Sequence, residues 1–566
     1  IVLLGRDRQV EPRRTLADEG RLNADYVPGM VTVLDARRQQ ALGARTVFEA
    51  LAWVPGVLNY RANSVEPFLT VRGISFPFNS GNIKILIDGV AMNRETSGVS
   101  GHALLMPLSQ VERIEMTRGP GAVLYGDFAF NGVVNIITRE ETQMVFAQVE
   151  DPQVATTGVI GRWGDPADGF ALSVNLSGSQ SDEPEIPQDN SQDTDRRGFG
   201  HIRARYRDFS LSFQSVRRKL ESRRRPAAEE TSDAWVAAHE REWRQGLSSR
   251  LALTHLSTKH ETPGRNFDGD ELNFDGQLDF EQSPRQFWRL RLGVVDSHTD
   301  EAAQPGPGQM PGQPPGQGAT IRVHDIDRQG WGLGVQHEAD VGRLGLTLGL
   351  RYDYRDAIDE DRLTPRIGLV WRATEQHLFK LQYTEGFRAP TFFELFPRPN
   401  TQSDLELETI ATTELSYIYR RASQVLRLTS FYSAIEDMIF PAGPGVFANA
   451  AEGYSRGAEA EIETQWGATR LFANASYVGA RTNRGRPDGF VNDPDSARWL
   501  ANLGLLHDFG AAGTVGLHLN HFSERESPDP RVGDQNLLHL SYSLSNVLLP
   551  GLDLRLGLRN LLRDAE

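Results

Sequence analysis

From about Thr142 onward, the chain alternates apolar residues with small or charged ones. In the segment LGLTLGLRYDY, leucines at 344, 346, 348 and 350 alternate with glycine, threonine and arginine. Successive side chains of a β-strand point to opposite faces, so each such segment predicts a strand with one apolar and one polar face. A soluble sandwich would also alternate. However, many segments exceed about ten residues, and their polar faces carry arginines and aspartates that need water or a polar partner, which favours a membrane-spanning barrel.

The connections between these segments alternate in length. Tight turns such as 341–343 alternate with longer segments such as 387–409. Membrane barrels of bacteria have short periplasmic turns and longer outer loops, whereas a soluble sandwich has no reason for this asymmetry. We count about 21 strands, the last from 552 to about 561, but a closed antiparallel barrel of this type needs an even number. We therefore expect the given sequence to be cut short of one last strand.

Composition excludes several other classes of protein. The chain is 24% charged and has no run of 18 apolar residues, so it is not a bundle of transmembrane helices. It has no cysteine, and its net charge of −15 argues against nucleic acid as a partner. It does not begin with Met, and we expect an export signal to have been removed. No Ser-His-Asp, metal-ligand or paired-carboxylate pattern stands out, so we expect no catalysis, no cofactor and no bound metal.

The leading quarter of the chain has a different pattern, which predicts a small α+β domain. The segment TVFEALAWVPGV (46–57) has helical apolar spacing, with Thr46 as the N-cap and Pro55-Gly56 as the stop. Short strands are predicted at 68–72, 83–88, 111–117 and 133–138. The largest membrane barrels enclose a lumen wide enough to hold a domain of this size.

Three motifs in this domain resemble the plug of TonB-dependent outer-membrane receptors. They are LTVRGIS (69–75), ILIDGV (85–90) and PLSQVERIEMTRGPGAVLYGDFAFNGVVNIIT (107–138), and they occur in the family's order. The later segment YTEGFRAPTFFELF (383–396) resembles the Phe-Arg-Ala-Pro segment that opens a large extracellular loop. The stretch DFAFN (127–131) departs from the family, which commonly has small residues and a double glycine there. The resemblance implies an all-β transmembrane fold, a 22-stranded antiparallel outer-membrane barrel with an N-terminal α+β plug inside.

The resemblance also implies a domain division and a function. We expect an N-terminal extension at 1–25, the plug at 26–140 and the barrel at 141–566. The expected function is TonB-dependent active uptake of a scarce substrate across the outer membrane of a Gram-negative bacterium, first of all a ferric siderophore. Cobalamin, haem, another metal complex, a saccharide and a non-transporting structural role remain alternatives. The implied partners are TonB with the inner-membrane ExbB-ExbD motor, outer-membrane lipid and lipopolysaccharide, and an extracellular metal chelate; we expect a monomer.

Coupling to TonB would need a TonB box, a short extended segment ahead of the plug that pairs with TonB by strand addition. The β-prone start of the chain is the candidate, and a disordered terminus is the alternative. The candidate residues are Ile1, Val2, Leu3, Leu4 and Gly5.

Five charged plug residues are candidates for polar contacts with the barrel wall. In a free domain they would be ordinary surface charges. Inside a barrel they would face a polar inner wall, where partly buried charges need partners. These residues are Arg72, Asp88, Arg113, Glu115 and Arg118.

Substrate contacts are expected where plug loops and the Phe-Arg-Ala-Pro segment approach the extracellular mouth. Aromatic and polar side chains there suit a mid-sized ligand, with simple loop packing as the alternative. The absence of histidine between 387 and 414 makes haem less favoured. Acidic stretches at 181–195 and 266–276 leave calcium open, although neither has EF-hand spacing. The substrate candidates are Phe76, Phe78, Asn79, Asn93, Arg94, Glu95, Phe387 and Arg388.

Overall fold

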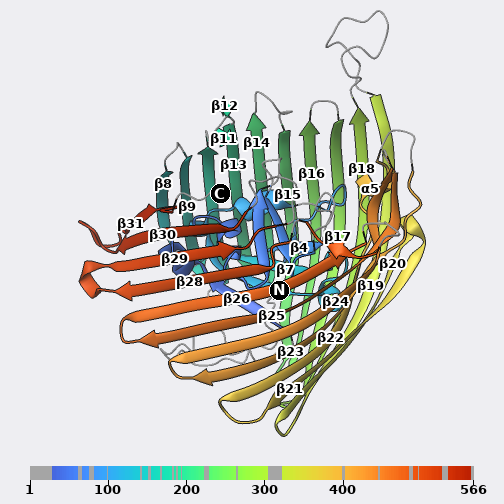
Figure 1. Cartoon of the computed structure of the whole chain (residues 1–566). Helices are drawn as coiled ribbons and strands as arrows, with labels where there is room; N and C mark the ends of the chain where they lie inside the picture. The colour runs from blue at the N-terminus through green and yellow to red at the C-terminus, as the bar shows by residue number, and fades with distance from the viewer. Residues whose placement is uncertain are drawn as a thin grey trace, which may run out of the picture.

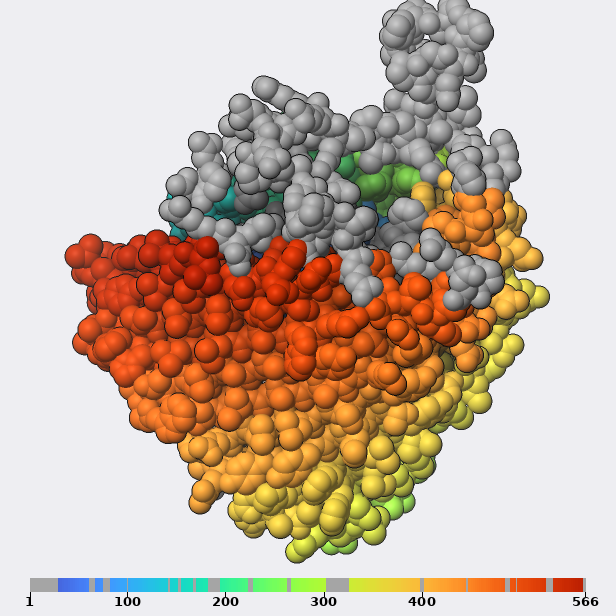
Figure 2. Space-filling view, in the orientation of Figure 1, coloured from blue at the N-terminus to red at the C-terminus, as the bar shows by residue number. Residues whose placement is uncertain are grey.

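A computed structural model describes residues 29–562, apart from gaps at 62–66, 75–81, 99, 141–142, 151–153, 166–168, 182–183, 187–188, 193, 222–227, 263–264, 304–320, 398–401, 444–445, 484–488, 495 and 526–532. Most of the described chain forms one closed antiparallel sheet, the barrel, which surrounds a small N-terminal domain (Figure 1). The later strands form a continuous outer surface in the same orientation (Figure 2). Each helix in this part of the chain is too short or too polar to cross a membrane.

The wall of the barrel is built from strands that follow one another along the chain and around the ring. They are β8 (Met144–Glu150), β9 (Val154–Asp165), β10 (Phe170–Ser181), β13 (Thr194–Tyr206), β14 (Phe209–Glu221), β15 (Ala228–Arg244), β16 (Leu247–Thr262), β17 (Arg265–Ser283), β18 (Gln286–Ala303), β19 (Ile321–Val341), β20 (Leu344–Arg355), β21 (Glu360–Arg372), β22 (His377–Arg388), β23 (Glu408–Arg421), β24 (Gln424–Gly443), β25 (Val446–Trp466), β26 (Thr469–Thr482), β27 (Val491–Asn492), β28 (Trp499–Asp508), β29 (Thr514–Phe522), β30 (Gln535–Leu544) and β31 (Leu554–Leu558). The small strands β11 (Pro184–Ile186) and β12 (Asp189–Gln192) form a separate hairpin between β10 and β13.

Within the described residues, 22 strands close the barrel, the number that the family resemblance implied. The sequence predicted about one strand fewer, because β27 has only two residues and belongs to a stretch that reads as an outer loop. The neighbouring strand β26 pairs with β27 at its outer end and with β28 along the rest of its length. The further strand expected beyond the given sequence stays a prediction.

The apolar face of the alternating segments points outward. On β20, Leu348 and Leu350 are both 42% exposed, whereas Thr347 and Arg351 on the opposite face are 5% and 8% exposed. The leucine rows therefore face the membrane and the polar residues face the lumen, as the alternation predicted.

Exposed aromatic side chains form two belts around the outside of the wall. Rings of this kind gather at the two interfaces between a membrane and water. One belt, near the tight turns, contains Trp163, Trp243, Trp288, Trp371 and Trp466, and the outer belt, nearer the long connections, contains Trp235, Trp331, Tyr432, Tyr477 and Trp499.

The domain inside the barrel is the plug. Its elements are β1 (Val31–Asp35), α2 (Ala36–Ala41), α3 (Val47–Leu51), β2 (Val57–Arg61), β3 (Pro67–Val71), β4 (Ile83–Ile87), β5 (Val90–Ala91), the 3-10 helices η2 (Gly101–Leu105) and η3 (Leu108–Gln110), β6 (Val111–Arg118), α4 (Ala122–Tyr125) and β7 (Gly132–Thr138). Five strands form one sheet in the order β1-β6-β7-β4-β5, and β2 pairs with β3. The short helices η5 (Asp356–Ile358), α5 (Phe392–Leu395) and η6 (Gly510–Ala512) lie in connections of the barrel.

The plug has the predicted α+β character, with one difference at a helix. Strands β3, β4, β6 and β7 lie within one residue of their predicted bounds. Thr46 caps α3, and its Oγ1 accepts a hydrogen bond from the Glu49 backbone at 3.3 Å. The helix ends at Leu51, earlier than predicted, because Pro55 disfavours helical backbone in the residue before it and Gly56 turns the chain with a φ of 70°.

The apolar core of the plug continues into the wall. Buried side chains of the plug sheet and of α3 share one cluster with Phe199 of β13, Val216 of β14 and Phe472 of β26. The unusual DFAFN stretch adds to this contact, since Phe130 is fully buried in a second cluster with Phe431 of β24. The aromatic side chain thus fills space between plug and wall where the family commonly has small residues.

Candidate functional site: the contact between plug and wall

Arg72 follows β3 in a turn that directs its side chain at the wall. Arg72 and Gly73 both have positive φ, 54° and 76°, and a Cβ on Gly73 would lie 2.2 Å from Ser496 Oγ. Arg72 Nε and Nη2 donate hydrogen bonds to Glu459 of β25 at 3.0 and 3.4 Å, and its Nη1 forms an ion pair with Glu414 of β23. Glycine is therefore required beside the arginine, because no side chain fits this close approach.

Arg118 reaches the same wall from the end of β6. Its Nη1 donates to Glu459 Oε2 at 2.6 Å, and its Nη2 donates to Glu461 at 2.9 Å. Both arginines are buried, so their charges depend on the carboxylates rather than on water. We call Arg72, Arg118, Glu414, Glu459 and Glu461 the arginine–glutamate network.

Burial and charge act in opposite directions on Arg72. Desolvation alone would lower the pKa of its guanidinium, but Glu414 and Glu459 outweigh this effect and raise the pKa above its ordinary value. The Arg72 guanidinium also lies 4.2 Å from the ring centre of Phe431. The arginine therefore stays charged, and the network holds the plug through charge-assisted bonds that need every partner in place.

Asp88 joins the plug to another part of the wall. Its Oδ1 accepts a hydrogen bond from the Thr138 backbone at 3.0 Å, and its Oδ2 lies 3.1 Å from His201 Nδ1 and 3.7 Å from Arg203 Nη2, both on β13. Burial would raise the pKa of Asp88, but His201, Arg203 and the Thr138 amide hold it well below its ordinary value. Asp88 is thus an ionised anchor at neutral pH.

The plug loop after β5 contacts the wall nearer the long connections. Arg94 Nη2 donates to Glu230 of β15 at 3.0 Å, and Glu95 Oε2 forms an ion pair with Arg328 of β19 at 2.9 Å. Asn93 stays inside the plug, where its Nδ2 donates to the carbonyls of residues 83 and 98 at 2.9 and 2.8 Å. Arg94 and Asn93 are buried, so in this conformation they brace the loop.

Phe387 and Arg388 end β22 and are both 0% exposed. Arg388 donates to Glu394 at 2.8 and 3.0 Å and to Glu408 at 2.5 Å, and these bonds close the base of the outer loop that follows. Neither side chain reaches solvent in this structure. Their contact with a substrate stays a prediction.

The first residues of that outer loop are fastened to the plug through backbone amides. The Ala389 amide donates to Asp127 Oδ1 at 3.0 Å, and the Phe392 amide donates to the Glu95 carbonyl at 3.2 Å. Phe393 N donates to the carbonyl of residue 96 at 2.9 Å. Movement of this loop would therefore act directly on the apex of the plug.

The other predicted site residues have different outcomes. Arg113 Nε donates to Glu115 at 2.8 Å, and Asn135 Nδ2 donates to Glu115 at 3.4 Å, all within the plug sheet. Their contact with the wall stays a prediction. The remaining candidates lie outside the described residues; they are Ile1, Val2, Leu3, Leu4, Gly5, Phe76, Phe78 and Asn79.

The sequence did not reveal the wall partners of the plug. Glu459 contacts Arg72 although they lie 387 positions apart, and in the sequence it is one of several glutamates on an alternating strand. Glu230 and Glu414 are similar cases. The available signal was a glutamate on an inward-facing position, which is equally expected of any residue that lines a wet lumen.

One group within the described residues has metal-ligand geometry. His298, Asp300 and Asp325, at the outer ends of β18 and β19, offer ligand atoms that lie within 4.8 Å of one another. The group is on the outer surface, and exposed carboxylates gather in this way without a metal, so we assign it none. The acidic stretch at 266–276 lies on β17, where alternate side chains face opposite ways and do not converge on one ion.

A wide membrane barrel whose lumen is filled by its own N-terminal domain, held there by buried polar contacts, defines the class of plugged outer-membrane barrels. A family model described as "TonB dependent receptor-like, beta-barrel" matches residues 149–561, and one described as "TonB-dependent Receptor Plug Domain" matches residues 23–133. The chain therefore belongs to the TonB-dependent receptor family, as its motifs indicated. Members are non-enzymatic proteins of the outer membrane of Gram-negative bacteria.

Known proteins resemble this chain at two levels. The siderophore receptor PirA of Acinetobacter baumannii superposes with a TM-score of 0.76 at 15% identity, covering 97% of this chain and 95% of that one. The ferric enterobactin receptor PfeA of Pseudomonas aeruginosa gives 0.74 at 16%, covering 96% and 94%. By sequence, the iron-regulated outer membrane virulence protein of Vibrio cholerae is 25% identical over 73% of this chain and 66% of its own length. The vitamin B12 transporter BtuB of Vibrio vulnificus is 22% identical over 72% and 67%.

Proposed function

We propose that this protein takes up a ferric siderophore across the outer membrane by TonB-dependent active transport. The observation that carries the proposal is the plug itself, which fills the lumen and is attached to the wall only by non-covalent contacts within the described residues. A barrel blocked in this way passes a substrate when its plug is displaced. Displacement has to break the arginine–glutamate network, which requires energy from outside the molecule.

The iron assignment is supported by what similar proteins are known for. PfeA is a ferric enterobactin receptor, PirA is a siderophore receptor, and the Vibrio cholerae relative is iron-regulated. Cobalamin is the second candidate, since the Vibrio vulnificus relative is a vitamin B12 transporter. Both cargoes are metal complexes too large for simple diffusion through a porin.

The proposed mechanism runs from the outer loop to the N-terminus. Substrate binds at the extracellular mouth, where Phe76, Phe78 and Asn79 are the candidate contacts. Binding shifts the loop after β22 and loosens its bonds to Glu95 and Asp127. TonB then pairs with the segment from Ile1 to Gly5 and, driven by ExbB-ExbD, pulls the plug from the wall.

Uptake of labelled substrates tests this proposal. A Gram-negative host that lacks its own receptors would express the full chain or a chain without residues 1–5. We expect the full chain to import iron-55 as a catecholate or hydroxamate chelate and the shortened chain to bind the chelate at the cell surface without importing it. Replacement of residues 1–5 by a Gly-Ser segment of equal length is the matched control for chain length, and it should also fail to import.

Other results would change the assignment. Import of cobalt-57-labelled cobalamin but of no iron chelate would favour the second candidate. Import that is unchanged in a host without TonB, or the absence of both binding and import for every chelate, would favour the non-transporting structural role.

A further inference from the structure

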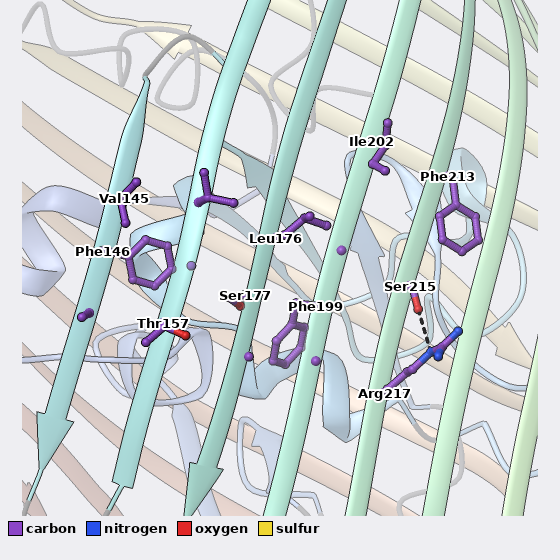
Figure 3. A pocket seen from close by; sticks show the side chains of 16 residues that line it. Val145, Phe146, Thr157, Leu176, Ser177, Phe199, Ile202, Phe213, Ser215 and Arg217 are labelled. Atoms are coloured by element: carbon purple, nitrogen blue, oxygen red, sulfur yellow. Dashed lines mark hydrogen bonds between the residues drawn. The ribbon is translucent and has the colours of Figure 1, made fainter.

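An apolar groove lies on the outer face of the wall, on the side of β8, β9, β10, β13 and β14 that is turned away from the plug (Figure 3). Its volume is about 690 Å³, within the range of ligand-binding pockets. Side chains such as Val159, Leu176, Ile202 and Phe213 form its sides. It is separate from the plug contact described above, so a ligand here does not depend on the transport function.

The floor of the groove is formed by glycines that no internal packing requires. A Cβ built on Gly178 or Gly198 would lie 4.0 Å from its nearest neighbouring atom, so a side chain would fit at either position. Elsewhere in the wall, glycine has an internal reason: a Cβ on Gly457 would lie 2.1 Å from the carbonyl oxygen of Tyr477. Glycine weakens a strand and often marks a site that a ligand approaches closely. The open space over Gly178 and Gly198 therefore serves something outside the protein.

The place of the groove in the membrane limits what that something is. Phe213 lies 4.7 Å from Trp235, ring centre to ring centre, and Trp235 belongs to the outer aromatic belt. From this level the groove runs toward the long connections, where Gly198 pairs with Arg217 across the sheet. The surroundings at this height are the outer leaflet of the membrane and its head groups.

The outer end of the groove is basic. The side chain of Arg217 is 62% exposed; its Nε donates to Ser215 Oγ at 3.2 Å and its Nη2 to Asp233 at 3.3 Å. Arg196 and Lys219 lie on the same rim, 3.8 and 3.0 Å from Glu221. Three cations thus face two carboxylates, and the hydrogen bonds orient Arg217 without enclosing it.

We propose that this groove binds a phosphate-bearing, acylated lipid of the outer leaflet. An acyl chain lies over Gly178 and Gly198, between the apolar sides, and a phosphate of the head group meets Arg217. The guanidinium is suited to this role because it pairs with phosphate through two parallel hydrogen bonds. Charge complementarity at the rim, together with the lipid-facing position of the floor, favours such a lipid over a protein partner.

Native mass spectrometry of the purified full chain in detergent tests the proposal. One probe is a bis-phosphorylated, hexa-acylated lipid A, and the other is the same lipid without phosphates. Gly198→Leu fills the floor and Arg217→Ala removes the charge. The matched controls are Gly276→Leu, an outward glycine of β17 whose Cβ would meet its nearest atom at 3.5 Å, and Arg241→Ala, an exposed arginine near the tight turns.

We expect Gly198→Leu to weaken binding of both probes about tenfold, and Arg217→Ala to weaken only the phosphorylated probe by about the same factor. Both controls should bind like the unmodified protein. The proposal is overturned if the groove variants bind like the controls, or if Gly198→Leu abolishes a receptor dimer and leaves lipid binding unchanged. Melting temperatures report on folding, and Gly178→Leu replaces Gly198→Leu if that variant does not fold.

Discussion

The wall holds the plug in two different ways on its two sides. Strands β23 and β25 hold it with the buried arginine–glutamate network. Strands β26 and β28 hold it with neutral groups: Asn474 Nδ2 donates to the Trp53 carbonyl at 2.8 Å, and Asn502 Nδ2 donates to the Ala52 carbonyl at 2.9 Å. Breaking a buried ion pair leaves an uncompensated charge, whereas a neutral hydrogen bond is partly replaced by water. We infer that the neutral side separates first when the plug is displaced.

Loss of one carboxylate from the network should have the largest effect. Glu459→Gln removes the charge shared by Arg72 and Arg118 and should weaken plug attachment by about 3–5 kcal/mol. The measurement is the urea concentration at which the plug is released, read as the opening of a conducting pore in a planar lipid bilayer. Glu461→Gln, which removes a single and more exposed bond, is the matched control and should shift this concentration less. Equal shifts would remove the distinction between shared and single carboxylates.

Acid should weaken a neutral attachment while it spares the network. His102 of η2 lies 3.1 Å from Ser232 of β15, and burial lowers its pKa to about 3, despite the opposing effect of Glu230. Once the plug is released, this pKa returns to about 6.5. The depressed pKa means that stability is fully present above about pH 6.5 and is lost as pH falls toward 3, about 2 kcal/mol of it at pH 5.

The same bilayer assay at pH 7 and pH 5 checks this expectation. His102→Gln should remove most of the difference between the two pH values. Asp88 is not a competing cause in this window, because its depressed pKa delays any loss until the pH falls below about 4. A pH dependence that persists in His102→Gln would assign the effect to another group.

A single bond on the neutral side should matter less. Asn474→Ala removes the donor to the Trp53 carbonyl and should cost about 1 kcal/mol. Its effect on plug release should therefore be well below that of Glu459→Gln. If the two variants are equivalent, charge does not distinguish the two sides.

The smallest effect is expected where charge is present without burial. Arg205 of β13 lies 3.1 Å from Glu140, in the segment that joins plug and barrel, and its side chain is partly exposed. Arg205→Ala should change plug release by no more than about 0.5 kcal/mol, because water screens such pairs. A loss as large as that of Glu459→Gln would show that charge, rather than burial, determines the strength of attachment.

Sequence reasoning succeeded where the signal is local. The alternation around Leu348, the N-cap Thr46 and the strands of the plug depend on neighbouring residues, and the structure has them as predicted. The helix at α3 was predicted too long because its apolar spacing continues past Leu51 to the proline. The two-residue strand β27 was missed because so short a segment has no periodicity to detect.

For the site, the sequence identified one half of each contact. It selected Arg72, Asp88 and Arg118 in the plug, whose contacts with the wall the structure then locates. It selected Arg94 and Arg388 as candidates for substrate, yet in this conformation both are buried in ion pairs with glutamates. Electrostatic partners such as Glu230 and Glu394 become recognisable only when the strands that carry them are placed around the plug.

The amino-acid sequence alone determined that this chain forms an outward-apolar barrel with a plug ahead of it, since alternation and turn motifs act over a few residues. Which carboxylate meets which arginine, and which glycines leave a groove open to lipid, were decided only by the closed ring of strands. Closure brings together residues hundreds of positions apart, and the buried or exposed surroundings that result set how strongly each pair interacts.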